Sequence, residues 1–248
     1  MDTVFFYFML AFLLPRVVYQ WRDERRAGEG KALVWAALFE AVFLLPLMGA
    51  SSFFLLFAFI CAYHLFGYGM GRVIANVYLE RIVEFVFLLI GGGFFAGVFS
   101  RRLVFNREQL RVLGDFIHYH VLLDRYSAAD MGTVLIVLFG VVVLVNEMNS
   151  VVRFILNAIR TEPMLNADTP DERELGRGKI IGIIERLLFF FFVLTDNFAS
   201  IAFILAAKGF TRFRMLDDKN FAEYMLIGTL LSSAISIFWA YYIRFLIG

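Results

Sequence analysis

Ile82–Phe99 reads IVEFVFLLIGGGFFAGVF, an apolar run in which Glu84 is the single ionisable residue. About 20 residues of α-helix, rising ~1.5 Å each, cross the ~30 Å hydrocarbon layer of a membrane. Because no water is present there to bind backbone N–H and C=O groups, a crossing segment must be helical. The run therefore predicts a membrane-embedded helix.

Six further runs along the chain have the same character. They are Val4–Val18, Ala32–Leu47, Phe53–Phe66, Met131–Val145, Ile180–Ala207 and Phe221–Ile247. Of the 248 residues 61% are hydrophobic, and the mean hydropathy is +0.76. We therefore predict an all-α fold, a polytopic transmembrane bundle of six to seven membrane-embedded helices.

Two of these runs contain helix-disfavouring residues near their middle. Gly91–Gly93 interrupts Ile82–Phe99, and Thr195–Asn197 interrupts Ile180–Ala207. Non-helical backbone at membrane depth is tolerated where it is buried in protein or lines a cavity. We expect at least one helix to be interrupted or re-entrant at these places.

The polar stretches between the runs predict three regions. Residues 1–160 form an N-terminal membrane region, in which 100–130 has the helical spacing of an amphipathic segment at the interface. Residues 161–178 hold two prolines and many charges, which predicts a polar linker. Residues 179–248 form a C-terminal helical unit.

The charge balance indicates which partners to expect. The chain has 23 Lys and Arg and 22 Asp and Glu, a net charge of +1, so no overall field attracts nucleic acid. The predicted partners are the lipid bilayer and either further copies of the chain or other membrane subunits. The predicted location is the cell membrane, crossed several times, and no cofactor is predicted.

Ionisable residues inside the runs are candidates for an ion or substrate pathway. Each costs roughly 2.5–3.5 kcal/mol on insertion scales, so each needs a partner or a purpose. The ionisable candidates are Glu40, His64, Glu84 and Asp196, and Asn197 beside Asp196 adds neutral donors and acceptors to the pathway. Asp196 lies near the midplane if its run crosses the membrane, but it is a turn residue or a satisfied core residue if the run is a hairpin.

A second set of charges predicts structural ion pairs in the C-terminal unit. Glu185 and Arg186 lie close to the charged loop, so both side chains are expected to extend to the interface. If Ile180–Ala207 is a hairpin, its ends return to one side and Lys208 can meet Glu185. Glu223 is the remaining member of this set.

Metal-binding residues are sparse. His118 and His120 stand two apart, and on a helix such residues point in nearly opposite directions. His120 and Asp124 stand four apart and share a face, and His64 is the remaining weak candidate. No motif of a hydrolase, a nucleotide-binding loop or a zinc protease occurs.

Three blocks near the C-terminus resemble a known family. They are Gly178–Leu188, with the pattern GxxIGxxER, Ala206–Lys208 and Ala222–Ser232, with the pattern AEYxLIGTLLS. The chain is similar here to an uncharacterised family of bacterial integral membrane proteins. The resemblance implies a bacterial inner-membrane location, but it supplies no activity.

The N-terminal half of that family carries His- and Asp-rich spans like those of membrane-embedded metal-dependent hydrolases. In this chain Phe6–Gln20 has neither residue type, Leu79–Glu84 has glutamate in place of a histidine, and His64 lacks the nearby aspartate. Two hypotheses follow. We favour a protein without catalytic activity, either a small transporter or channel-like module or a membrane subunit of a larger assembly, over a degenerate metal-dependent hydrolase.

Overall fold

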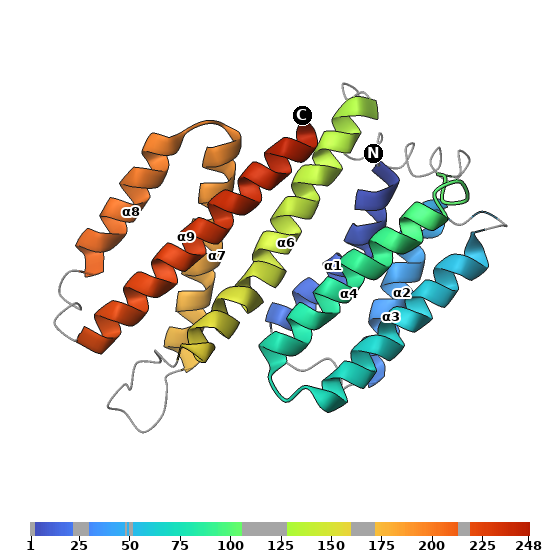
Figure 1. Cartoon of the computed structure of the whole chain (residues 1–248), viewed down its shortest axis with the longest axis horizontal. Coiled ribbons are helices and arrows are strands. Elements are labelled where there is room, and N and C mark those ends of the chain that lie inside the picture. Colours follow the sequence, from blue (N-terminus) through green and yellow to red (C-terminus); the bar gives the residue numbers. More distant parts are fainter. Residues whose placement is uncertain are drawn as a thin grey trace. The chain divides into compact units, whose positions relative to one another are not determined.

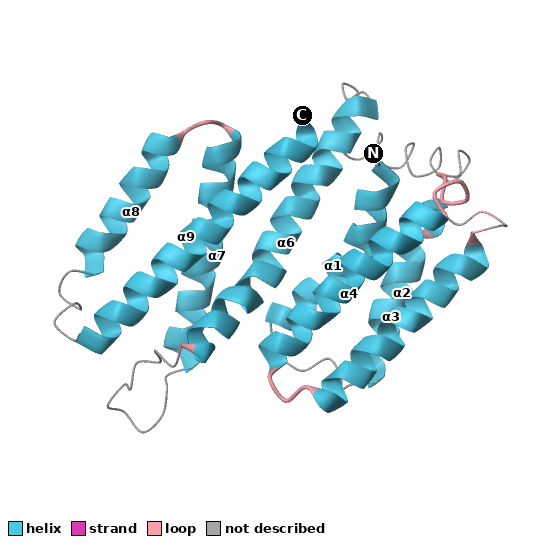
Figure 2. Ribbon diagram, in the orientation of Figure 1, coloured by secondary structure: helices cyan, strands magenta, loops and turns pink. Residues whose placement is uncertain are grey.

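The computed structural model describes residues 3–21, 30–47, 49, 52–105, 128–159, 172–212 and 219–248. Within these ranges the chain forms eight α-helices and one short 3-10 helix, and no strand (Figure 2). The prediction of an all-α fold is therefore confirmed for the described residues.

The helices follow the apolar runs. The first half holds α1 (Thr3–Trp21), α2 (Gly30–Phe43), the 3-10 helix η2 (Leu45–Leu47), α3 (Phe53–Val73) and α4 (Val77–Val98). The second half holds α6 (Ala128–Ala158), α7 (Glu172–Leu194), α8 (Phe198–Arg212) and α9 (Lys219–Ile247) (Figure 1).

Four helices of the described chain are long and apolar enough to cross a membrane. These candidate spans are Phe53–Val73, Val77–Val98, Gly132–Ala158 and Leu226–Ile247, in α3, α4, α6 and α9. Shorter apolar stretches lie in α1, α2 and α8.

The chain divides into two compact units, Met1–Val142 (unit 1) and Val143–Gly248 (unit 2). The division falls inside α6, whereas the sequence predicts a linker at 161–178. Residues 160–171 lie outside the described part, but 172–178 are the first turns of α7, so this half of the predicted linker is helical.

Unit 1 is built on aromatic packing. The helix α1 packs against α2 and α4, and α3 packs against the same two helices. Phe8 and Phe12 of α1 meet Phe59 of α3 with ring centroids 5.2 and 5.4 Å apart, and Phe95 of α4 lies 4.7 Å from Phe59. Such offset and edge contacts add about 0.5–1.5 kcal/mol each to the burial of the rings.

Unit 2 is centred on α7, which packs along α9 and also contacts α8. Phe190 and Val193 of α7 and Ala240 and Ile243 of α9 are fully buried. A Cβ atom at Gly228 of α9 would lie 3.7 Å from a methyl group of Leu156, so α9 also approaches α6 closely.

The described surface is apolar where a water-soluble protein would be polar. Trp35, Phe94, Phe203 and Phe245 are 71%, 74%, 73% and 81% exposed. Large apolar side chains that are exposed to this degree are typical of a protein whose solvent is lipid. The interior, by contrast, holds charged side chains.

Of the two places where a helix interruption was expected, only one is interrupted in the structure. The helix α4 continues through Gly91–Gly93, so the glycine run does not break it. The run Ile180–Ala207 is interrupted as predicted, because α7 ends at Leu194 and α8 begins at Phe198. The expected amphipathic segment at 100–130 lies mostly outside the described residues, and 100–105 are not helical.

Candidate functional site

A buried ion pair joins three helices of unit 1. Arg16 of α1 donates to Glu84 of α4, with Nη1 2.7 Å from Oε2, and to the hydroxyl of Tyr63 of α3 at 2.9 Å. A third bond runs from Arg16 Nη2 to the carbonyl of Arg81 at 3.0 Å. Arg16 and Glu84 are each 3% exposed and Tyr63 is fully buried. A charge-assisted pair in such surroundings is stronger than a neutral hydrogen bond.

The start of α4 positions its charged face. The side chain of Asn76 accepts hydrogen bonds from the N–H groups of Tyr78 and Leu79 at 2.9 and 3.2 Å, which caps the helix. Glu80 and Glu84 then lie one turn apart on the buried face. Both glutamate side chains are therefore buried in the bundle near the capped N-terminal end of α4.

A second buried contact lies beside the first. His64 Nε2 is 2.8 Å from Glu40 Oε2, and Glu40 is fully buried while the His64 side chain is 13% exposed. Tyr63 and His64 are neighbours on α3, with ring centroids 5.5 Å apart. Three predicted pathway residues, Glu40, His64 and Glu84, are therefore gathered around positions 63 and 64 of α3.

The predicted metal ligands are only partly described. His64 has Glu40 beside it, but the described residues contain no group of three or more His, Cys, Asp or Glu side chains that could hold an ion. His118, His120 and Asp124 lie outside the described part of the chain. The hydrolase alternative stays a prediction.

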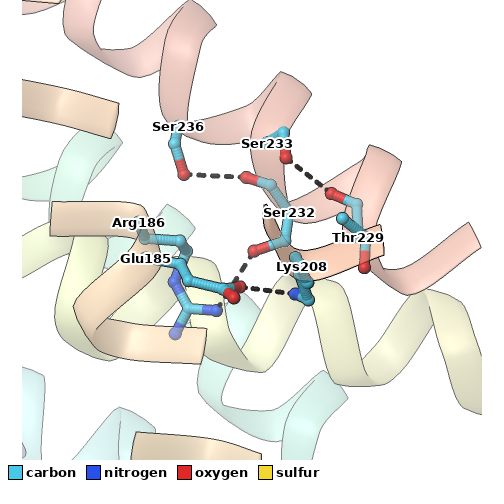
Figure 3. Close-up of polar contacts among 7 residues, drawn as sticks. All are labelled: Glu185, Arg186, Lys208, Thr229, Ser232, Ser233 and Ser236. Carbon is cyan, nitrogen blue, oxygen red and sulfur yellow. Dashed lines mark hydrogen bonds and ion pairs between the residues drawn. The ribbon is translucent and has the colours of Figure 1, made fainter. Parts of the chain in front are cut away.

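Unit 2 has its own polar cluster, drawn in Figure 3. Arg186 of α7 donates to Asn149 Oδ1 of α6 at 3.2 Å and to Ser232 Oγ of α9 at 3.5 Å. On the neighbouring position, Glu185 Oε2 lies 2.5 Å from Lys208 Nζ, which links α7 to α8. This is the pairing that a hairpin at Ile180–Ala207 predicts.

The expectation for Arg186 is wrong. Because α7 begins at Glu172, Arg186 lies well inside the helix, and it is 3% exposed instead of extending to the interface. Its partners, Asn149 and Ser232, are neutral. The side chain of Glu223, the other predicted member of this set, is outside the described part.

The turn between α7 and α8 holds Asp196 and Asn197. Asp196 has φ of 56°, a left-handed conformation that Asp and Asn tolerate. The N–H of Asn197 donates to the carbonyl of Phe192 at 2.7 Å, closing the turn. The Asp196 side chain is 58% exposed and pairs with Arg244 of α9. The hydrogen bond from Arg244 lowers the pKa of the Asp196 carboxyl. This geometry matches the hairpin-turn alternative.

Several polar residues were not anticipated from the sequence. Asn149 and Ser150 lie on α6 with Arg153 one turn further on, and Ser232, Ser233 and Ser236 lie on α9. Ser233 and Ser236 donate to the carbonyls of Thr229 and Ser232 in their own helix, both at 2.7 Å. Within each helix these polar residues recur at intervals of three and four positions, and this helical spacing could have revealed them from the sequence. In unit 1, Arg16 lies within the predicted run Val4–Val18 but was not among the predicted pathway residues.

Comparison of the chain with protein-family models, with curated proteins and with solved structures found no match. Fold and site together define the class: the described part of the chain is all-helical, with four helices suited to a membrane and charged residues buried among its helices.

Proposed function

We propose that the protein is a small multi-pass membrane transporter that moves protons through unit 1. Six to seven of its helices are embedded in the cell membrane, which is a bacterial inner membrane if the C-terminal resemblance holds. The observation that carries the proposal is the contact between His64 and Glu40, next to the pair of Arg16 and Glu84. Ionisable groups inside a membrane protein usually mark such a pathway.

Glu40 and His64 are suited to exchange one proton. With Nε2 and Oε2 2.8 Å apart, a proton on the imidazole passes to the carboxylate by breaking one N–H bond and forming one O–H bond. The products are a neutral imidazole and a neutral carboxylic acid. Of the two side chains, that of His64 is the more exposed, so His64 is the residue that exchanges protons with the surroundings of the protein.

Arg16 and Glu84 have a positioning role. The guanidinium holds the Tyr63 hydroxyl and the Glu84 carboxylate at once, which fixes the rotation of α3 at Tyr63 and so the direction of the next residue, His64. The proposal therefore assigns transfer to Glu40 and His64 and orientation to Arg16 and Glu84.

The test is proton flux into liposomes that contain the purified full chain and a pH-sensitive dye. A potassium gradient with valinomycin drives the flux. The wild type should exceed protein-free liposomes, and Glu40→Gln, which preserves side-chain volume, should lower the flux at least tenfold. His64→Gln should do the same.

The matched control is Arg72→Gln, an exposed position at the end of α3 in the same unit. Its flux should equal that of the wild type. Equal flux in the wild type and Glu40→Gln, or no flux above protein-free liposomes, would overturn the proposal. Circular dichroism and gel filtration establish that each variant is folded.

A further inference from the structure

The end of α2 leaves one backbone carbonyl for a partner outside the helix. The N–H of Leu44 donates to the carbonyl of Glu40 at 2.9 Å, as in an α-helix. The N–H of Leu47, which a continued α-helix would direct to Phe43, donates instead to the carbonyl of Leu44 at 2.9 Å. The carbonyl of Phe43 is therefore among the helix-terminal groups that need a donor from elsewhere.

Tyr7 of α1 supplies that donor. Its hydroxyl lies 2.5 Å from the carbonyl oxygen of Phe43, 36 residues further along the chain. The two rings stack with their centroids 4.7 Å apart, and the ring of Phe105 meets that of Tyr7 edge-on at 5.3 Å. Phe43 and Glu40 stand three positions apart, so the carbonyl that Tyr7 binds belongs to the same turn of α2 as the carboxylate.

The helix α1 holds α3 as well. Arg16 donates to the hydroxyl of Tyr63 at 2.9 Å, and Tyr63 directly precedes His64. In the described packing α1 contacts α2, and α2 contacts α3. The two side chains of the proposed transfer, those of Glu40 and His64, therefore lie on two helices that are each bonded to α1, one through Tyr7 and the other through Arg16.

We infer that Tyr7 is a positioning residue for Glu40: its hydroxyl caps α2 and so keeps the Glu40 carboxylate within hydrogen-bond distance of His64. The inference rests on the proposed proton transfer. Glu40 Oε2 and His64 Nε2 are 2.8 Å apart, and a misplacement of about 1 Å can slow a reaction roughly a hundredfold. Tyr7 does not touch the proton, because it acts through the backbone of α2.

Tyr7→Phe tests the hydroxyl alone, since it keeps the ring contacts with Phe43 and Phe105. Nitrogen-15 NMR of the full chain in detergent, labelled in histidine, reports the hydrogen bond of the His64 ring, and the signal that is missing from His64→Gln identifies it. In Tyr7→Phe this signal should move towards its value in Glu40→Ala, where no carboxylate is present. Proton flux into liposomes should fall severalfold in the same variant, because donor and acceptor are further apart.

The matched control is Ser52→Ala. Ser52 Oγ donates to the carbonyl of Leu47 at 2.7 Å and the residue is fully buried, so this variant also removes a hydroxyl-to-carbonyl bond close to the end of α2. It leaves the turn of Glu40 intact. Ser52→Ala should lower the thermal stability but leave the His64 signal and the flux unchanged. An unmoved signal in Tyr7→Phe, or an equal shift in the two variants, would overturn the inference.

The NMR signal and the flux separate the two proposals. A shifted signal with unchanged flux supports the positioning of Glu40 by Tyr7 and overturns proton transfer between Glu40 and His64. If Tyr7→Phe does not fold, Phe43→Leu replaces it, because it removes the ring stacked on Tyr7 and keeps the carbonyl. A His64 signal that Phe43→Leu leaves unmoved then counts against the inference.

Discussion

The carboxylate of Asp196 is held by Arg244 at an exposed turn, outside the candidate spans. Its pKa in the folded protein lies below the ordinary 3.8, mainly because of that hydrogen bond. Between the two values the unfolded chain binds more protons than the folded one, so stability falls as pH falls through this window.

Asp196→Asn should remove this acid dependence, so the variant should be slightly less stable than the wild type near neutral pH, where the pair with Arg244 contributes, and equal to it at acid pH, because Asn also tolerates the left-handed conformation. Carbon-13 NMR of the aspartate carboxyls reports the pKa directly. A wild-type value for Asp196 at or above 3.8 would contradict the assignment.

Arg16 and Glu84 provide a prediction about buried charge. Glu84→Met leaves the guanidinium without its carboxylate partner and should cost about 3–5 kcal/mol. The double variant Arg16→Met with Glu84→Met removes both charges and should recover most of that loss. Unfolding by sodium dodecyl sulfate measures all members of the cycle, and additive effects of the two substitutions would contradict the coupling.

Among the elements, α4 offers a comparison of adjacent glycines. A Cβ at Gly93 meets nothing within 4 Å, so Gly93→Ala should stabilise the helix by about 0.5–1 kcal/mol. A Cβ at Gly92 would lie 2.9 Å from Met9 Cε and 3.3 Å from Phe8 Cε1, both buried side chains of α1.

Gly92→Ala should therefore be less stable than Gly93→Ala by roughly 1 kcal/mol or more, since the packed core must shift. The same detergent unfolding assay compares the two. If both alanines had equal effects, the close approach of α1 to α4 would be refuted.

The helices were predictable at this scale because long apolar runs dictate helix in lipid. The hairpin at Thr195–Asn197 was also predictable, since three polar residues interrupt an apolar run too long for one crossing. The helix is not interrupted at Gly91–Gly93, because a glycine destabilises a helix by only about 1 kcal/mol and packing against α1 outweighs that cost.

The candidate sites were less predictable. Glu40, His64 and Glu84 were recognisable as charges inside apolar runs, but their partners depend on which helices pack together. Arg16 and Glu84 stand 68 residues apart, and no local pattern relates them. The burial of Arg186 was not predicted, because the sequence does not reveal that α7 begins as early as Glu172.

For the whole molecule, α3 and α4 predict a membrane topology. Both are candidate spans, they pack together, and a short connection, Ile74–Asn76, joins them (Figure 1). In a Cys61→Ser background, Ala75→Cys should react with a membrane-impermeant maleimide from one side and Ser100→Cys from the other. Labelling of both from the same side would exclude two consecutive crossings.

The distance along the chain between Arg16 and Glu84 also constrains how the protein is made. During synthesis α1 leaves the ribosome long before α4 exists, so the guanidinium has no carboxylate until 68 further residues are added. An unpaired arginine opposes entry into the bilayer. We expect α1 to insert stably only in nascent chains that include α4, which arrested chains of graded length will reveal: membrane integration of α1 should rise sharply once Glu84 has emerged.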